Sequence, residues 1–242
     1  MRPSADTLSI LAQVRIHERE PGKLSCVQDN GICPDWIVHH FDEYLAPLWR
    51  HLELTLSSVA IGFAIAFVLA LLAHERRWLT GPIIGVTGIL YTIPSLALFA
   101  ILIPLTCFGF TTALIPLTIY TLLVLFRNIV AGLDNVPAEA KDAALGMGFT
   151  DRQLLWKVEL PLALPEIFAG LRVATTTNVG LAALAFYAGA GGLGQQILTD
   201  ITFKSNILTA GLLCVLLAFV LDLTLLTIQR LLLPWQRARA TS

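Results

Sequence analysis

Long uncharged stretches divide most of the chain into segments that fit a lipid bilayer. Residues 54–73, 78–126, 173–199 and 205–229 contain no Lys, Arg, Asp or Glu apart from Asp222. A helix crosses the hydrocarbon core with about 20 apolar residues, so the run 78–126 is long enough for two spans and a turn. The pattern predicts an all-α integral membrane protein with about five transmembrane helices. The expected spans are residues 52–73, 82–103, 111–131, 170–188 and 207–229.

The composition agrees with a membrane protein and excludes other classes. Of the 242 residues, 56% are hydrophobic and 14% are charged, whereas soluble domains carry about 25% charged residues. A net charge of -1 provides no basic face for polyanions, so we expect no nucleic-acid partner. After residue 50 no polar stretch exceeds about 40 residues, which is too short for an independent core and excludes a soluble two-domain enzyme.

The basic residues indicate which way the spans cross the membrane. If the loop after the first span is cytoplasmic, ten Lys and Arg residues fall in cytoplasmic segments. The opposite side receives only Lys204 from its loops, plus Arg2, Arg15, Arg19, Lys23 and Arg50 in the N-terminal tail. The positive-inside rule then places the N-terminus outside and the C-terminus inside. We therefore expect an extracytoplasmic extension over 1–45, a transmembrane domain over 46–232 and a cytoplasmic tail over 233–242.

The N-terminal extension has no sustained hydrophobic period. Its most apolar part, 8–14, is too short for the core of a signal peptide, so we expect no cleavable signal. A start at a non-AUG codon near Leu24 is an alternative that the sequence leaves open. Cys26 and Cys33 could form a disulfide if they face an oxidising compartment, or they could stay reduced.

Three prolines lie within or beside the second and third expected spans. They are Pro94, Pro104 and Pro116. Proline kinks a helix, and the bilayer tolerates this only where neighbouring helices or a water-lined cavity satisfy the freed carbonyls. Kinked helices suit a gated pathway, although proline is also simply more frequent in membrane helices.

The polar loop between the third and fourth spans predicts two short helices. Pro137 is a good first helical residue, and the alanine-rich sequence after it predicts a helix over 137–146. Gly146 and Gly148 then offer the left-handed conformation of a helix C-cap.

A second helix should follow directly. Thr150 and Gln153 have the spacing of a capping box, and Pro161 should end the helix that they begin. The loop is therefore expected to form a cytoplasmic helix–turn–helix elbow over 133–168.

The elbow carries a recognisable motif. Asp142-Ala143-Ala144, Gly148 and Val158-Glu159-Leu160-Pro161 resemble the EAA motif, E-A-A-x3-G-x9-I-x-L-P, of permease subunits in binding-protein-dependent ABC importers. Asp142 replaces the usual glutamate and Val158 the usual isoleucine, and both keep the chemistry. The resemblance implies the type I ABC importer permease fold and an elbow that docks on a cytoplasmic ATPase. The expected ATPase-coupling residues are Asp142, Ala143, Ala144, Gly148, Val158, Leu160 and Pro161.

Other segments resemble one branch of this family. Residues 91–98, 127–128, 160–165, 169–172 and 189–194 are similar to permeases that import glycine betaine, carnitine, choline and related osmoprotectants. The resemblance implies an ABC ATPase dimer, a second permease copy or paralogue, and an extracytoplasmic substrate-binding protein as partners. Small side chains in the elbow would let its first helix approach the ATPase closely.

Two segments are candidates for the translocation pathway. One is the proline-containing turn with Thr92, Pro94 and Ser95. The other is the glycine-rich segment, which forms either a re-entrant turn near the pathway or an ordinary loop. Its candidate residues are Gly189, Gly191, Gly192 and Gly194.

Asp222 is the acidic residue well inside a span, where a charge costs roughly 2.5–3.5 kcal/mol. It either has a structural partner, such as Arg127 or a Ser/Thr cluster, or has a role with a substrate or proton.

The sequence predicts no catalytic site, cofactor or metal site in this chain. It contains no G-x4-G-K-[ST] phosphate-binding loop and no H-E-x-x-H zinc motif. ATP hydrolysis is therefore expected from a separate subunit.

Two alternatives remain: a permease for another small solute such as an amino acid, and a secondary transporter driven by an ion gradient. Five spans, no internal repeat and one intramembrane acid disfavour the second alternative.

Overall fold

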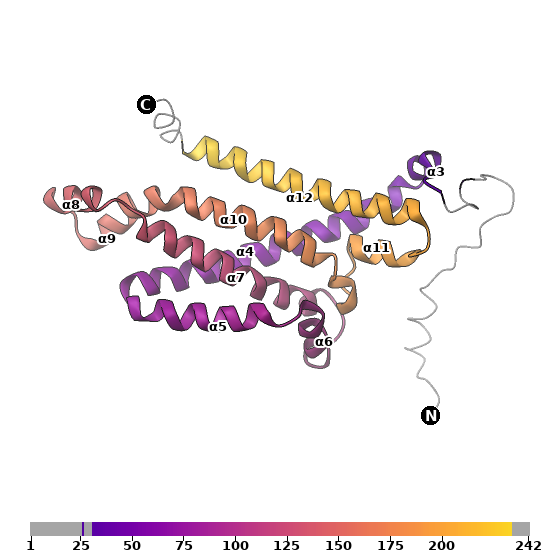
Figure 1. The fold of residues 1–242 in the computed structure, drawn as a ribbon, viewed down its shortest axis with the longest axis horizontal. Helices are drawn as coiled ribbons and strands as arrows, with labels where there is room; N and C mark the ends of the chain where they lie inside the picture. Colours follow the sequence, from indigo (N-terminus) through magenta and orange to yellow (C-terminus); the bar gives the residue numbers. More distant parts are fainter. Residues whose placement is uncertain (1–25, 27–30, 234–242) are drawn as a thin grey trace.

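The computed structural model describes residue 26 and residues 31–233, and all the regular structure formed by this part of the chain is helical (Figure 1). The long helices run roughly side by side, and short helices lie at both ends of the bundle. In chain order the elements are α3 (Pro34–His39), η1 (Phe41–Tyr44), α4 (Leu45–Glu75), η2 (Arg77–Leu79), α5 (Thr80–Thr92), α6 (Ser95–Thr106), α7 (Phe110–Asp134), α8 (Ala138–Gly146), α9 (Asp151–Leu154), the π-helical turn η3 (Leu155–Glu159), α10 (Leu160–Ala182), η4 (Ala185–Ala188), α11 (Leu193–Thr199) and α12 (Lys204–Leu232).

Among the described residues, three helical segments are long and apolar enough to cross a membrane. They are Phe41–Glu75, Phe110–Asp134 and Lys204–Leu232, which contain three of the five predicted spans. A fourth is added if the bent pair α5 and α6 counts as one span. The remaining predicted span, 170–188, belongs largely to α10, which has 23 residues but carries polar side chains such as Arg172 and Asn178.

The second predicted span, 82–103, is not one continuous helix. It is broken between α5 and α6, which meet at an angle of 92°. Ile93 and Pro94 both have extended backbone conformations, because proline has no N–H for the helical ladder and disfavours the helical conformation of the residue before it. The hydroxyl group of Tyr120 on α7 donates a hydrogen bond to the Ile93 carbonyl at the break. Pro104 and Pro116, in contrast, lie inside α6 and α7.

The fourth predicted span, 170–188, has different bounds in the structure. α10 begins at Leu160, inside the predicted elbow, and ends at Ala182, before the separate turn η4. The prediction that Pro161 ends the second elbow helix is wrong. Pro161 is the second residue of α10 and follows the π-helical turn η3, which joins α9 to α10 without a loop, so the helix continues through the proline.

α7 is the central helix of the bundle and packs between α4 and α10. Close approaches occur at glycines. A Cβ atom on Gly132 of α7 would lie 2.9 Å from the Ala163 carbonyl oxygen of α10, and one on Gly62 of α4 would overlap Thr121 of α7. α4 and α10 are also joined directly, because the Asn178 side-chain amide donates a 2.6 Å hydrogen bond to the Ser58 hydroxyl. These contacts hold the three helices as a compact core.

α12 packs against α10 on one side only. None of the most apolar part of α12 is buried within this chain. Large apolar side chains such as Val215 and Phe219 are more than half exposed. This surface is suited to lipid or to another membrane helix.

The segment before α4 is fastened to the start of α12. Cys26 and Cys33 form a disulfide, which settles the alternative left open by the sequence. The Cys33 N–H donates to the Ser205 hydroxyl at 2.9 Å, and that hydroxyl donates to the Gly31 carbonyl. Residues 31–44 are thus held at one end of the bundle. The predictions for 1–25, 27–30 and the tail 234–242 lie outside the described residues.

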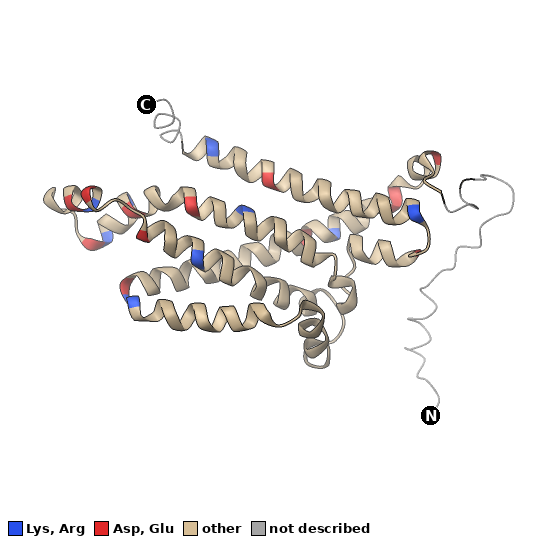
Figure 2. Ribbon diagram, viewed as in Figure 1, with Lys and Arg blue, Asp and Glu red and all other residues tan. Residues whose placement is uncertain are grey.

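Charged residues gather toward the ends of the long helices, while their middle parts are mostly uncharged (Figure 2). α8 and α9 lie at one end, and α3 and α11 lie at the other (Figure 1). The end of α12 lies on the side of α8 and α9. The elbow and the C-terminal end of α12 therefore share one face of the bundle, as the predicted orientation requires.

Candidate coupling site and translocation pathway

The first elbow helix, α8, forms close to where the sequence predicts it. It runs from Ala138 to Gly146, with Pro137 as its N-cap rather than its first helical residue. Glu139 lies in the first turn, where a carboxylate interacts favourably with the positive end of the helix dipole. The alanine-rich sequence provides the helix propensity.

A left-handed glycine ends α8. Gly148 has φ +85°, and its N–H donates to the Leu145 carbonyl at 2.9 Å while the Phe149 N–H donates to the Ala144 carbonyl at 3.1 Å. These two bonds form a Schellman motif with glycine at its left-handed position. Gly146 remains helical, so the predicted left-handed conformation is correct for Gly148 and wrong for Gly146.

The predicted capping box begins α9. The Gln153 N–H donates to the Thr150 hydroxyl oxygen at 3.4 Å, and the Thr150 N–H donates to the Gln153 side-chain oxygen at 3.1 Å. The backbone N–H groups of Thr150 and Gln153, which have no acceptor within the helix, are both satisfied in this way. The chain consequently turns sharply between α8 and α9.

The seven predicted coupling residues do not all lie on one surface. Asp142, Ala143 and Gly148 are exposed, whereas Ala144 is buried against the rest of the chain. The remaining three residues are partly buried at the junction of η3 and α10 and belong to the support of the elbow. They are Val158, Leu160 and Pro161.

The elbow also exposes apolar side chains that lie outside the motif. Leu145, Met147 and Trp156 are 46%, 70% and 51% exposed. A Cβ atom on Gly148 would meet no atom of this chain within 4 Å. In the sequence, these large apolar side chains stand out in an otherwise polar loop, and this contrast is the signal that indicates a contact surface. Their exposure in the structure is typical of a surface that binds a protein partner.

The glycine-rich segment forms an ordered turn against α4. Gly189, Gly191 and Gly192 have positive φ, and Gly194 is packed so closely against the Ala183 carbonyl that no side chain fits. His51 is fully buried. Its Nε2–H donates to the Val179 carbonyl at 2.9 Å, and its Nδ1 accepts from the Leu193 N–H at 3.4 Å.

These two bonds place the proton of the neutral imidazole ring on Nε2, because a carbonyl only accepts a hydrogen bond and an amide N–H only donates one. Arg50 holds the same turn through a 3.2 Å hydrogen bond from Nε–H to the Ala190 carbonyl. His51 and Arg50 on α4 therefore position the turn, and neither was selected from the sequence.

Within the described part of the chain, no hydrogen bond joins the two candidate pathway segments. Thr92 ends α5, and Pro94 and Ser95 begin α6. The glycine-rich turn instead meets the loop after α6, where the Gly109 N–H donates to the Ala188 carbonyl at 2.7 Å. Both segments lie toward the end of the bundle opposite the elbow (Figure 1).

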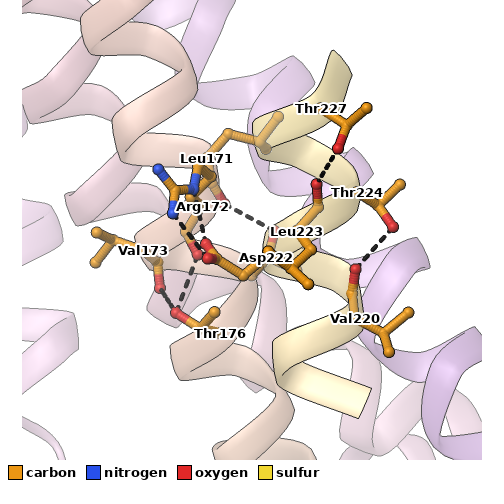
Figure 3. A network of polar contacts seen from close by, with 10 residues as sticks. Leu171, Arg172, Val173, Thr176, Val220, Asp222, Leu223, Thr224 and Thr227 are labelled. Carbon is orange, nitrogen blue, oxygen red and sulfur yellow. Dashed lines mark hydrogen bonds and ion pairs between the residues drawn. The ribbon is translucent and has the colours of Figure 1, made fainter. Parts of the chain in front are cut away.

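Asp222 has a structural partner that differs from the predicted one. The Arg172 guanidinium on α10 forms two 2.7 Å hydrogen bonds with the Asp222 carboxylate on α12 (Figure 3). Arg127 is exposed, and the nearby hydroxyls of Thr224 and Thr227 bond to carbonyls of their own helix. The prediction of Arg127 or a Ser/Thr cluster as partner is therefore wrong, because sequence separation does not show which helices are neighbours.

The fold and the elbow define a class of protein. Apolar helices form a membrane bundle, a polar elbow with an exposed face lies at one end, and a broken helix and a glycine-rich turn lie toward the other. This is the architecture of a permease subunit of a membrane transporter. The chain belongs to the family described as binding-protein-dependent transport system inner membrane component, whose model matches residues 59–238. It is therefore a multi-pass protein of the inner membrane.

Two curated relatives match most of the chain. The osmoprotectant import permease protein OsmW of Salmonella typhimurium is 40% identical over 199 residues, which are 79% of this chain and 93% of the relative. The carnitine transport permease protein OpuCB of Listeria monocytogenes is 35% identical over 206 residues, which are 83% of this chain and 94% of the relative. The match thus extends over nearly the full length of both relatives.

A solved structure has the same fold. A chain of the MetNI methionine ABC transporter, solved in inward-facing conformations, superposes with a TM-score of 0.69 and 26% identity over 78% of this chain and 95% of that chain. The fold is that of the type I ABC importer permeases, as the elbow motif implies.

Proposed function

We propose that this chain is the permease subunit of an ATP-driven importer for an osmoprotectant such as glycine betaine, carnitine or choline. A second permease copy or paralogue completes the translocation pathway, a substrate-binding protein delivers the solute from outside, and ATP is hydrolysed on a separate ABC ATPase dimer. The observation that carries the substrate class is the 40% identity with the osmoprotectant permease of Salmonella typhimurium over 93% of its length.

The elbow supports the coupling part of the proposal. α8 exposes Asp142 and Ala143 together with the apolar side chains of Leu145 and Met147. A short helix with small residues and exposed apolar groups can enter a groove of a partner closely, and burial of those groups would stabilise the contact. The C-terminal end of α12 lies on the same face, which is the cytoplasmic face in the predicted orientation.

The alternative with a specific observation in its favour is an amino-acid permease. The structural relative is a methionine transporter. Its 26% identity is lower than the 40% and 35% of the osmoprotectant and carnitine permeases, so the osmoprotectant proposal is preferred.

Uptake by the reconstituted complex tests the proposal. The permease, its ATPase and its binding protein are placed in proteoliposomes, and uptake of labelled glycine betaine, carnitine, choline and methionine is measured with ATP or a non-hydrolysable analogue inside. We expect ATP-dependent uptake of at least one quaternary ammonium compound. Uptake of methionine alone would assign the chain to the alternative substrate class. Uptake that needs an ion gradient but no ATP would contradict an ABC importer.

A further inference from the structure

A buried carboxylate at the base of the elbow holds two basic side chains. Glu159 is 4% exposed. Its Oε1 lies 2.7 Å from the Lys141 Nζ, and its Oε2 lies 2.9 Å from the His74 Nε2. The Lys141 ammonium also donates to the Leu133 carbonyl at 3.5 Å. Both oxygens of one carboxylate are therefore used, each by a different helix.

These contacts join α8 to the three core helices α4, α7 and α10. Lys141 belongs to α8, His74 to the last turn of α4, and Leu133 to the last turn of α7. Glu159 ends the π-helical turn and directly precedes α10. Lys141 and Glu159 therefore connect α8 at one point to α4, α7 and the start of α10.

The two faces of α8 have different roles in this arrangement. Lys141 and Ala144, three residues apart on one helical face, point into the bundle, whereas Asp142 and Ala143 are exposed. The face that binds Glu159 is therefore distinct from the face available to an ATPase. A change in the first face can alter transmission without removing the docking surface.

His74 also borders a cavity, which gives the contact room to rearrange. The cavity has a volume of about 210 Å³ and lies between the ends of α4, α5 and α7, with Arg77, Thr80 and Asp134 in its lining. Breaking the ion pair between Lys141 and Glu159 is costly, because it leaves a buried carboxylate without its ammonium partner. The three side chains are accordingly expected to move together.

We propose that Glu159 is a positioning residue of the coupling machinery, a carboxylate that links the motion of α8 to the transmembrane helices through Lys141 and His74. This inference rests on the proposed function as an ABC permease. Glu159 occupies the unspecified position of the I-x-L-P part of the motif, so the motif itself does not assign this role.

The test uses the complete complex with its ATPase and binding protein in proteoliposomes. Glu159→Gln and Lys141→Met break the link, and Glu139→Gln is the matched control because Glu139 lies on α8 with Lys141 but is exposed. Co-purification measures docking, and the ratio of substrate imported to ATP hydrolysed measures coupling. We expect unchanged docking and basal ATP hydrolysis in the two link variants, with a coupling ratio reduced by about tenfold, a typical size for a coupling effect. The control should keep the wild-type ratio.

A charge exchange separates positioning from folding. The double variant Lys141→Glu with Glu159→Lys restores the ion pair between residues 141 and 159 but not the contact with His74, and should recover part of the lost coupling ratio. If the Glu159→Gln variant does not assemble into a complex, the double variant alone tests the inference. A wild-type ratio in assembled Glu159→Gln, or an assembled exchange variant with no recovery, overturns the inference. Absence of ATP-dependent import by the wild-type complex would instead reject the proposed function.

Discussion

At the residue scale, the structure assigns Gly148 a conformational role. Its left-handed backbone forms the turn between α8 and α9, while a Cβ atom would have open space around it within this chain. Substitution is therefore unfavourable because of backbone strain and not because of crowding inside the permease. Any further effect of a larger side chain must come from a partner that covers this position.

The two glycines of the elbow provide a matched pair of alanine substitutions. Gly148→Ala should cost about 1–3 kcal/mol because alanine strains the left-handed conformation, and should weaken docking on the ATPase by tenfold or more if the turn shapes that surface. Gly146→Ala should be neutral or stabilising by up to about 1 kcal/mol, because Gly146 is helical and alanine favours a helix. ATPase affinity in detergent measures both variants. Equal affinities for the two would show that the left-handed turn does not matter for docking.

Asp222 and Arg172 provide a second residue-level prediction. Asp222→Lys places a cation beside Arg172 within the membrane-spanning part and should impair assembly, at a cost of about 3 kcal/mol for the unpaired charge. Asp222→Asn keeps one hydrogen-bond acceptor for the guanidinium and should be milder. The yield of folded protein and its thermal midpoint in detergent measure the effect. A normal yield and midpoint for Asp222→Lys would mean that the pair is dispensable for folding.

At the element scale, a disulfide, a backbone hydrogen bond and an aromatic contact hold α3 at the start of α12. Cys33 is both half of the disulfide and the donor to Ser205. Trp36 on α3 also packs edge-on against Phe203, with 4.7 Å between the ring centroids. The loop closed by the disulfide therefore directly precedes α3, and both contact the start of α12.

Removal of this disulfide should loosen α3 more than the bundle. For a loop of this length, the Cys26→Ser variant should lose roughly 2–3 kcal/mol of local stability through unfolded-state entropy. Proteolysis and hydrogen exchange of 31–44 should increase, while exchange of α7 should stay as in the wild type. Faster exchange throughout α7 would show that the segment supports the whole bundle.

The broken helix is the second feature at this scale. Tyr120 binds the Ile93 carbonyl, which the break leaves outside the helical ladder. Tyr120→Phe should cost about 1–3 kcal/mol, because the part-buried Ile93 carbonyl then loses its donor. The thermal midpoint of the detergent-solubilised protein measures this loss. An unchanged midpoint would indicate that another group or water binds the carbonyl.

At the scale of the whole molecule, the orientation in the membrane follows from the ends of the bundle. Ala138 lies at the elbow end, and Ile201, which is 59% exposed, lies at the opposite end. Cysteines at these positions, with Cys107 and Cys214 replaced by alanine, should react differently with a membrane-impermeant reagent applied to intact cells. Ile201→Cys should be labelled, and Ala138→Cys should be labelled only after lysis. The reverse pattern would invert the predicted topology.

The sequence alone determined the class and the local structure of the protein. Uncharged runs of suitable length define membrane segments, because the bilayer core excludes unpaired charges whatever the neighbouring helices are. The elbow was equally predictable, since Pro137, the alanines, Gly148 and the Thr150 capping box act within a few residues of one another. Local backbone chemistry was therefore sufficient for α8 and the start of α9.

Only the tertiary structure decided which distant groups meet. Arg172 rather than Arg127 binds Asp222 because α10 packs against α12, and Glu159, directly before α10, meets His74 because α10 also packs against α4. The local rule also failed at Pro161, since the π-helical turn before it leads directly into α10 and the helix continues through the proline. Pairings of this kind depend on the three-dimensional arrangement of whole helices, which residue spacing along the chain does not specify.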